Sequence, residues 1–231
     1  MKKVYHLDAD KVPKKIIIMG DPQRVVNISE LLKTPVVISK SRDLFVYKGY
    51  YNNKEVGLAA HGIGGPSAAI VIEELIKLGA DTLVRLGTVG SLKEEIDIGD
   101  IIIPTGASFW HGGAGLGMYF NNICPPTNPS YDLVYDLIKE IDNARLKYYV
   151  GPIFSSDSFY SEKDYINTLV KLNFIGIEME CATLFAISNL RGIRSACTLV
   201  TSNNLIKGTE GKYDEIVKNV SKIILDVITN Q

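Results

Sequence analysis

The sequence has little of what metal sites, disulfide frameworks and membrane spans require. Its 231 residues include three histidines and three cysteines, and neither set shows zinc-ligand spacing or a C-x-x-C pair. We therefore expect no bound metal and three free thiols, with a bridge left open only at Cys124, which precedes two prolines. The apolar runs are short and the first residues contain no signal-like apolar segment, so we expect a cytoplasmic protein without a membrane span.

An excess of positive charge and the common nucleotide-binding motifs are absent as well. Lys and Arg number 25 against 26 Asp and Glu, which gives a formal net charge of −1 and argues against a nucleic acid partner. The chain contains neither G-x-x-x-x-G-K-[ST] nor G-x-G-x-x-G, so ATP and NAD sites are not favoured. Any anion-binding site must therefore be formed by a few neighbouring residues and not by an overall positive charge.

Short apolar runs alternate with amphipathic segments along the whole chain. The former are typical of buried strands and the latter of helices. The predicted strands are Ile16–Met19, Val36–Ile38, Val56–Ala60, Thr82–Leu86, Ile101–Ile103 and Ala196–Thr201, and the predicted helices are Pro22–Leu32, Pro66–Leu78, Tyr131–Ile141, Glu162–Leu172, Glu178–Leu190 and Tyr213–Thr229. This alternation predicts an α/β fold, a single domain over residues 1–231 with a mixed, largely buried β-sheet flanked by helices on both faces.

Three turns that contain glycine follow predicted strands, at Gly20–Pro22, His61–Pro66 and Gly87–Ser91. Glycine there lets an anion approach backbone N–H groups, although each turn taken alone could be ordinary turn chemistry. Arg24 follows the first turn, and Arg85 lies inside an apolar strand, where an unpaired cation is unfavourable. Arg85 therefore needs a partner, either a bound anion or an acidic residue of the core.

Two further polar segments could contact a ligand. Glu178 and Glu180 flank Met179, and their carboxylates could bind a ribose diol or simply favour the N-terminus of a helix. Ser202 and Asn203 end the last predicted strand and could hydrogen-bond a heterocycle or form a turn.

An aromatic pair and a glycine-dense segment complete the set of candidates. Phe159 and Tyr160 could stack on a planar base or belong to the core. The segment from His111 to Gly117 is not followed by a helical pattern, so we expect a mobile loop there rather than a nucleotide cradle.

Taken together and in order, these segments resemble the nucleoside phosphorylase family, which includes hexameric purine nucleoside phosphorylases, uridine phosphorylases and archaeal methylthioadenosine phosphorylases. The motifs that carry the resemblance are Gly20-Asp21-Pro22-x-Arg24, His61-Gly62-x-Gly64-Gly65-Pro66-Ser67, Arg85-x-Gly87-Thr88-x-Gly90, Ser156-Asp157-x-Phe159-Tyr160 and Glu178-Met179-Glu180. The resemblance covers nearly the whole chain, and the segments Leu146–Gly151 and Glu178–Phe185 are most similar to the archaeal purine and methylthioadenosine enzymes.

The resemblance implies phosphorolysis, in which phosphate attacks the ribosyl C1′ and releases the base, with no cofactor beyond phosphate as co-substrate. It implies phosphate binding by Gly20, Arg24, Arg42, Arg85 and Thr88, ribose binding by His6, Met179 and Glu180, and base binding by Gly90, Phe159, Ile177, Ser202 and Asn203. The resemblance also implies that Asn203, Arg85 and Glu180 are the catalytic residues. His6 and Arg42 would come from a neighbouring subunit, so the family expectation is a homohexamer built from dimers, with a nearly inactive monomer.

One departure from the family pattern concerns the base. Purine members carry Ser-Asp where this chain has Ser202-Asn203, and an amide cannot supply the proton that the carboxyl gives to the purine N7. An amide suits a 6-oxopurine, as in inosine or guanosine, better than adenine, although adenosine and methylthioadenosine stay possible. Uridine is the alternative, because uridine phosphorylases carry Asn near this position. Their Gln- and Arg-containing insertion has no counterpart between Tyr160 and Glu178, so purine is favoured.

Two other functions remain open, a hydrolytic nucleosidase of the same fold and a nucleoside-binding protein without catalysis. A hydrolase has no use for three arginines that converge on an anion, so Arg24, Arg42 and Arg85 favour phosphate. Only Asn203 favours the binding protein.

Overall fold

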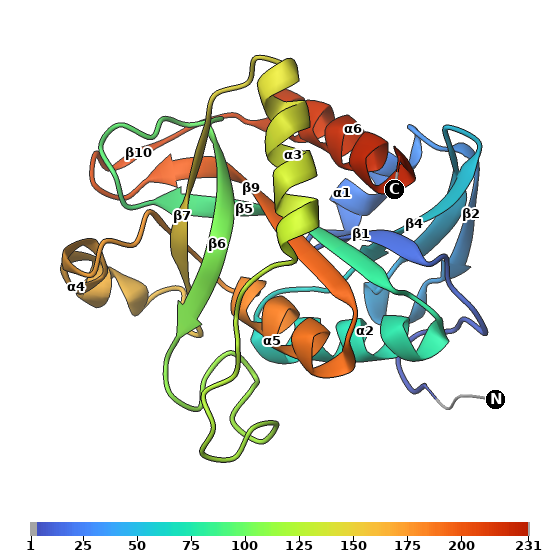
Figure 1. The fold of residues 1–231 in the computed structure, drawn as a ribbon, viewed down its shortest axis with the longest axis horizontal. Helices are drawn as coiled ribbons and strands as arrows, with labels where there is room; N and C mark the ends of the chain where they lie inside the picture. Colours follow the sequence, from blue (N-terminus) through green and yellow to red (C-terminus); the bar gives the residue numbers. More distant parts are fainter. Residues whose placement is uncertain (1–3, 231) are drawn as a thin grey trace.

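The computed structural model describes residues 4–230, which form one ten-stranded sheet with helices on both faces (Figure 1). The strands are β1 (Lys15–Met19), β2 (Lys33–Ser39), β3 (Val46–Tyr51), β4 (Lys54–Ala60), β5 (Thr82–Ser91), β6 (Ile101–Phe109), β7 (Tyr148–Ser155), β8 (Gly176–Glu178), β9 (Arg194–Asn204) and β10 (Thr209–Glu210). The helices are α1 (Pro22–Ser29), α2 (Gly65–Leu78), α3 (Tyr131–Asn143), α4 (Ile166–Lys171), α5 (Cys181–Arg191) and α6 (Asp214–Asn230), with short 3-10 helices η1 (Ser41–Asp43) and η2 (Glu162–Tyr165). The predicted fold class is confirmed.

The sheet is mixed and partly closed. Its order is β10-β9-β6-β7-β8-β5-β1-β4-β3-β2, and β9 also pairs with β5. Strands β5, β8, β7, β6 and β9 therefore form a closed ring, while β1, β4, β3 and β2 extend from it as an open sheet. The central pairs β1–β4, β1–β5 and β5–β9 are parallel, so β1, β5 and β9 end on the same side of the sheet.

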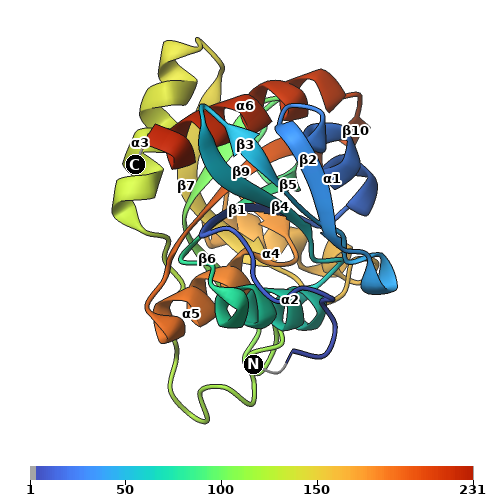
Figure 2. The same ribbon diagram turned by 90° about the vertical axis from the view of Figure 1, so that its right-hand side faces the viewer.

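Alternating side chains of the strands divide the core into two layers. In β1, Ile16 and Ile18 pack with α2 and α5, while Ile17 and Met19 pack with α1, α3 and α6. Successive side chains of a strand point to opposite faces, so an unbroken apolar run such as β1 must be covered on both sides. Figure 2 shows α2 and α5 on one face and α3 and α6 on the other.

Several sequence-based boundaries need correction. The predicted strand Val36–Ile38 lies in the edge strand β2 rather than in the buried interior, and Val36 is half exposed. The segment Glu162–Leu172 divides into η2 and α4. The predicted helix Glu178–Leu190 begins at Cys181, because Glu178 belongs to β8. Strands β3, β7, β8 and β10 were not predicted; β8 and β10 are too short to show a periodicity.

The glycine-dense segment predicted as a mobile loop is anchored at its centre. Ala114 and Leu116 are buried, the N–H of Ala114 donates to the carboxylate of Asp157 at 2.9 Å, and its carbonyl accepts the Thr183 hydroxyl at 2.6 Å. These bonds join the loop to the helix α5 and to the segment after β7. No helix within residues 4–230 is long and apolar enough to cross a membrane.

Candidate active site

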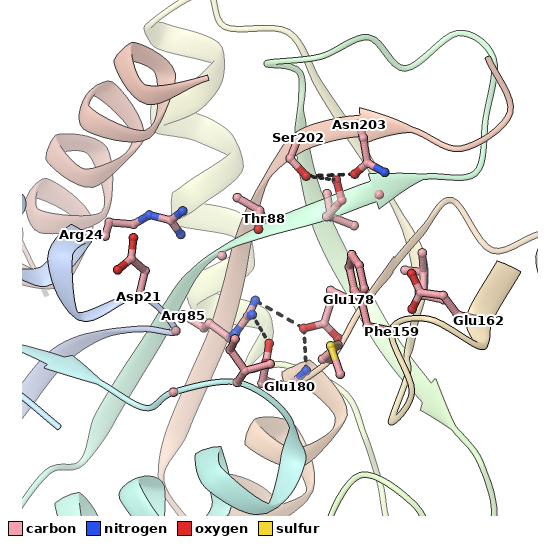
Figure 3. A pocket seen from close by; sticks show the side chains of 18 of the residues that line it. Asp21, Arg24, Arg85, Thr88, Phe159, Glu162, Glu178, Glu180, Ser202 and Asn203 are labelled. Carbon is pink, nitrogen blue, oxygen red and sulfur yellow. Dashed lines mark hydrogen bonds and ion pairs between the residues drawn. The ribbon is translucent and has the colours of Figure 1, made fainter. Parts of the chain in front are cut away.

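A cavity of about 680 Å³ lies beside β5, where β1, β8 and β9 end. Its walls include all but two of the residues assigned to the site from the sequence, namely Gly20, Arg24, Arg85, Thr88, Gly90, Phe159, Ile177, Met179, Glu180, Ser202 and Asn203. Ligands of parallel α/β sheets bind at the carboxyl ends of the strands, so the cavity lies where the topology places a ligand. Figure 3 shows Arg24 and Arg85 toward one side of the cavity, and Phe159, Glu162 and Asn203 toward the other.

The N-terminus of α1 places Arg24 at the cavity. Asp21 is the N-cap, with its carboxylate accepting the N–H of Gln23 at 2.8 Å, and Pro22 starts the helix. Burial lowers the pKa of the Arg24 guanidinium, and the nearby Arg85 cation lowers it further. Two arginines close enough to repel each other form a site that an anion would stabilise.

Arg85 is held inside the structure by two carboxylates. Its side chain is 4% exposed, and its guanidinium forms ion pairs with Glu180 and, at 3.3 Å, with Glu178. Burial lowers the pKa of Arg85, but Glu180 and Glu178 more than offset this and keep it above its ordinary value. A Cβ atom at Gly87 would overlap the guanidinium, so a side chain at this position would displace Arg85 from its ion pairs. The core ion pair considered from the sequence is therefore present, and Arg85 lines the cavity as well.

Glu178 and Glu180 converge on Arg85 because the chain changes from strand to helix between them. Glu178 ends β8 and its carboxylate accepts the N–H groups of Glu180 at 2.8 Å and Cys181 at 3.0 Å, which caps the start of α5. Burial raises the pKa of Glu178. Glu180 accepts the N–H of Gly64 at 2.6 Å, and its pKa is lowered because Arg85 offsets the effect of burial. The carboxylate of Glu178 therefore caps the start of α5, and Glu178, Met179 and Glu180 all line the cavity.

His61 is a buried group beside this ion pair. Its ring is fully buried, and neither ring nitrogen has a hydrogen-bond partner within residues 4–230. Burial lowers its pKa to about 4, and the neighbouring Arg85 contributes to the shift. His61 is therefore neutral at pH 7 and adds no charge to the cavity.

The other end of the cavity has fewer charged side chains. Gly90 pairs with Ile177 of β8 and with Asn203 of β9, which brings three strands together at this point. Phe159 is 63% exposed and faces the opening. The Ser202 hydroxyl lies 3.0 Å from Asn203 Oδ1 and 3.4 Å from the carbonyl oxygen of Val89. The aromatic ring and the amide suit a planar heterocycle.

Glu162 also lines this end, although it was not among the predicted site residues. It belongs to η2, and burial raises the pKa of its carboxyl, while a hydrogen bond from the Ser156 side chain lowers it. Its only sequence signal is its position just after the Ser-Asp-x-Phe-Tyr motif.

His6 and Arg42 do not line the cavity of their own chain. The carboxylate of Glu74 accepts the backbone N–H groups of Tyr5, His6 and Leu7 and lies 2.9 Å from His6 Nδ1. Arg42 is exposed in η1, with a left-handed backbone at φ 55°. Both residues therefore lie on the surface of the protein.

One cavity brings together two arginines, two carboxylates beside Arg85 and, at its other end, an aromatic ring and an amide. No group of three or more His, Cys, Asp or Glu side chains within residues 4–230 is arranged to hold a metal ion. The two arginines favour an anion, and the Glu180 carboxylate can accept hydrogen bonds from hydroxyl groups.

Comparisons with known proteins place the chain in a family. Residues 14–229 match the family model described as the phosphorylase superfamily. The chain is 33% identical over 217 residues to a guanosine phosphorylase of Halorubrum lacusprofundi, covering 93% of this chain and 89% of that one. It is 30% identical over 218 residues to a uridine phosphorylase of Thermococcus kodakarensis, covering 88% and 78% of the two chains. It is 32% identical over 195 residues to a DeoD-type purine nucleoside phosphorylase of Buchnera aphidicola, covering 83% and 82%.

The fold matches a solved structure over its whole length. The crystal structure of uridine phosphorylase from Vibrio fischeri ES114 superposes with a TM-score of 0.90 at 28% sequence identity, covering 100% of this chain and 99% of that one. The chain belongs to the nucleoside phosphorylase family, pentosyltransferases that act on a nucleoside and phosphate.

Proposed function

We propose that this enzyme phosphorolyses 6-oxopurine ribonucleosides, guanosine or inosine, to the free base and ribose 1-phosphate, with phosphate as the only co-substrate. Adenosine and methylthioadenosine are weaker substrates in this proposal. The observation that carries it is the hydrogen bond between the Ser202 hydroxyl and Asn203 Oδ1, at 3.0 Å.

That hydrogen bond sets which group of the Asn203 amide meets the base. With Oδ1 accepting from Ser202, Nδ2 is left to donate. A 6-oxopurine offers acceptors at both O6 and N7, whereas adenine has a donor at position 6. An amide donor therefore complements guanine or hypoxanthine and opposes adenine.

Glu162 supports guanine in particular. An ionised carboxylate is an acceptor only, and guanine presents the two donors N1–H and N2–H along one edge. Adenine has an unprotonated N1 there, which an ionised Glu162 would repel. Asn203 and Glu162 line the same end of the cavity, so one base could reach both.

At the other end, Gly20, Arg24, Arg85 and Thr88 would hold phosphate beneath the ribosyl C1′. A phosphate oxygen forms the bond to C1′ while the C1′–N9 bond breaks, and its electron pair passes to the base. The Glu180 carboxylate would hold the ribose diol beside Met179 and favour the positive charge that develops on the sugar. The Nδ2–H of Asn203 would stabilise the leaving purine at N7, and the released base would take its proton from solvent.

Uridine is a second candidate, because uridine phosphorylases occur among the relatives and the superposed structure. Uracil carries two carbonyl acceptors and one N–H donor, which an amide and a carboxylate could also bind. Uracil offers Glu162 one N–H donor, whereas guanine offers two along one edge, so uracil would satisfy this carboxylate less fully.

The test is release of free base from guanosine, inosine, adenosine, methylthioadenosine and uridine, each with and without phosphate. We expect phosphate-dependent release, fastest from guanosine or inosine. Preference for uridine would overturn the purine proposal, and release without phosphate would indicate a nucleosidase.

We also propose that the active enzyme is a homohexamer built from dimers, in which His6 and Arg42 complete the neighbour's site. Their surface position, away from the cavity of their own chain, supports this arrangement. The variants Arg24→Ala and Arg42→Ala should each have low phosphorolytic activity. A mixture of the two should regain activity after the subunits exchange. In a mixed dimer one site has Arg24 from one chain and Arg42 from the other. No gain on mixing, or a fully active monomer, would contradict the proposal.

A further inference from the structure

A second cavity, of about 290 Å³, adjoins the base end of the active site. Its lining residues are Trp110, Phe154, Ser156, Asp157, Ser158, Ser161, Glu162, Tyr165, Leu169 and Ile177. Only Glu162 and Ile177 also line the first cavity, among residues 4–230. The two cavities therefore share a wall that these two residues form.

The walls of this second cavity suit a flat apolar group. Trp110 lies edge-to-face against Phe154, with ring centroids 5.7 Å apart, and against Tyr165, with centroids 5.0 Å apart. Trp110 is 47% exposed and Tyr165 is 44% exposed, so both rings keep open surface, while Leu169 and Ile177 are buried. An apolar cavity of about 150 Å³ is enough to hold benzene, so this one has room for an aryl group.

Two polar residues of the second cavity accept hydrogen bonds from the backbone. The Ser156 hydroxyl accepts the N–H of Ser158 at 3.2 Å. Asp157 accepts the N–H of Ala114 at 2.9 Å. Glu162 lines both cavities, so its carboxylate could accept from a base in the first cavity while the aromatic side chains line the second.

We propose that this cavity is an accessory subsite of the base pocket, which receives an aryl group carried on the exocyclic 2-amino nitrogen of guanine. This rests on the proposed function, in which Glu162 accepts from the N1–H and N2–H edge. A secondary amine at position 2 keeps one N–H for Glu162, and its substituent, on the other bond of this nitrogen, would enter the neighbouring cavity beside that side chain. The enzyme would then use N2-arylmethyl guanosines, which a closed base pocket would reject.

The kinetic test compares guanosine with N2-benzylguanosine, both with phosphate. We expect kcat/KM for the benzyl compound to stay within about tenfold of that for guanosine. Trp110→Ala and Tyr165→Ala should each lower kcat/KM for the benzyl compound about tenfold and leave guanosine within about twofold, because aromatic contacts of this kind discriminate by roughly that factor. Tyr135→Ala, an exposed tyrosine of α3 that lines neither cavity, is the matched control and should change neither value.

A variant that fills the second cavity also tests whether this cavity receives the benzyl group, and it leaves the aromatic lining residues in place. Ser161 is exposed and lines only the second cavity, so Ser161→Phe should exclude the benzyl compound and spare guanosine. Trp110 is the only tryptophan of the chain, so its fluorescence reports occupancy directly. N2-benzylguanine should change that emission at concentrations where guanine does not.

The possible outcomes distinguish failure of the subsite from failure of the proposed function. Turnover of guanosine with neither turnover nor a Trp110 response for the benzyl compounds overturns the subsite and leaves the proposed function intact. Equal losses for both nucleosides in the wall variants also overturn it. Turnover of uridine but not guanosine would contradict the proposed function itself, and with it the guanine orientation that the subsite requires.

Discussion

The Arg85 guanidinium is bound by the carboxylate of Glu180, and this ion pair joins the middle of β5 to the N-cap of α5. The second oxygen of Glu180 accepts the N–H of Gly64, the N-cap of α2. A carboxylate has about four lone-pair positions, so Glu180 can still accept from a diol. The proposed phosphate and ribose sites are therefore one electrostatic unit, and a change at Arg85 disturbs both.

Replacing Arg85 should destabilise the fold before it reports on phosphate. Arg85→Met would leave Glu178 and Glu180 buried without a cation, and loss of one partner of a buried ion pair lowers the free energy of unfolding by about 3–5 kcal/mol. Urea unfolding at pH 7.5 measures this change. The double variant Arg85→Met with Glu180→Gln should recover part of the loss, and a loss below about 1 kcal/mol for the single variant would be incompatible with the ion pairs.

Arg24 gives a cleaner test of the phosphate site, since it forms no ion pair within 4 Å among residues 4–230 and is only partly buried. Arg24→Ala should raise KM for phosphate about tenfold to a hundredfold, which is the range for a lost hydrogen bond to a charged group. KM for the nucleoside and the free energy of unfolding should change little. Arg145→Ala, an exposed arginine outside the cavity, is the control. A parallel rise in both KM values would exclude a specific phosphate role.

Much of the site could be predicted because its residues lie in turns that local chemistry specifies. Gly20 and Arg24 bracket a turn with an N-cap and a proline, and Arg85 is conspicuous as a cation in an apolar strand. Gly64 is also set locally, because its backbone has φ 86°, a conformation that favours glycine. In such segments the local sequence largely determines the backbone conformation that brings the residue to the site.

Convergence of Glu178 with Glu180 could not be predicted in the same way. Residues two apart diverge on a helix, and only the three-residue strand β8 changes that geometry. Its length is too small for a hydrophobic period, so the segment was assigned to a helix. Glu162 was missed for a related reason, since its direction depends on how η2 packs beside Ile177, and no local pattern encodes that contact.

The amide of Asn203 should set the preference between 6-oxopurines and 6-aminopurines. Asn203→Asp adds an acceptor for the adenine amino group and, when protonated, a donor for N7. The ratio of kcat/KM for adenosine to that for inosine should rise about tenfold or more. Ser202→Ala, which removes the hydrogen bond that orients the amide without adding a carboxyl, should reduce discrimination by lowering inosine turnover. An unchanged ratio in Asn203→Asp would remove this residue from the specificity argument.

The three thiols should differ sharply in reactivity. Cys124 is exposed, whereas Cys181 and Cys197 are buried with their sulfur atoms 2.7 Å apart, and burial raises the pKa of Cys181 well above its ordinary value. A thiol reagent should label one cysteine in the native protein and three after denaturation without reductant. In Cys124→Ser the rapid labelling should disappear. Detection of only one thiol in the denatured wild type would show that the buried pair is oxidised.

His61 should make the fold sensitive to mild acid. Its folded pKa of about 4 lies below the unfolded value of 6.5, so between these values the unfolded chain binds more protons and stability falls as the pH falls. From pH 7 to pH 4.5 the loss from this group is about 2.5 kcal/mol. His61→Gln should remove that part of the pH dependence in urea unfolding, whereas His111→Gln, at an exposed histidine, should not. If wild type and His61→Gln lost equal stability over this range, the buried imidazole would have to be protonated in the folded state, a second cation that Glu178 and Glu180 would have to balance together with Arg85.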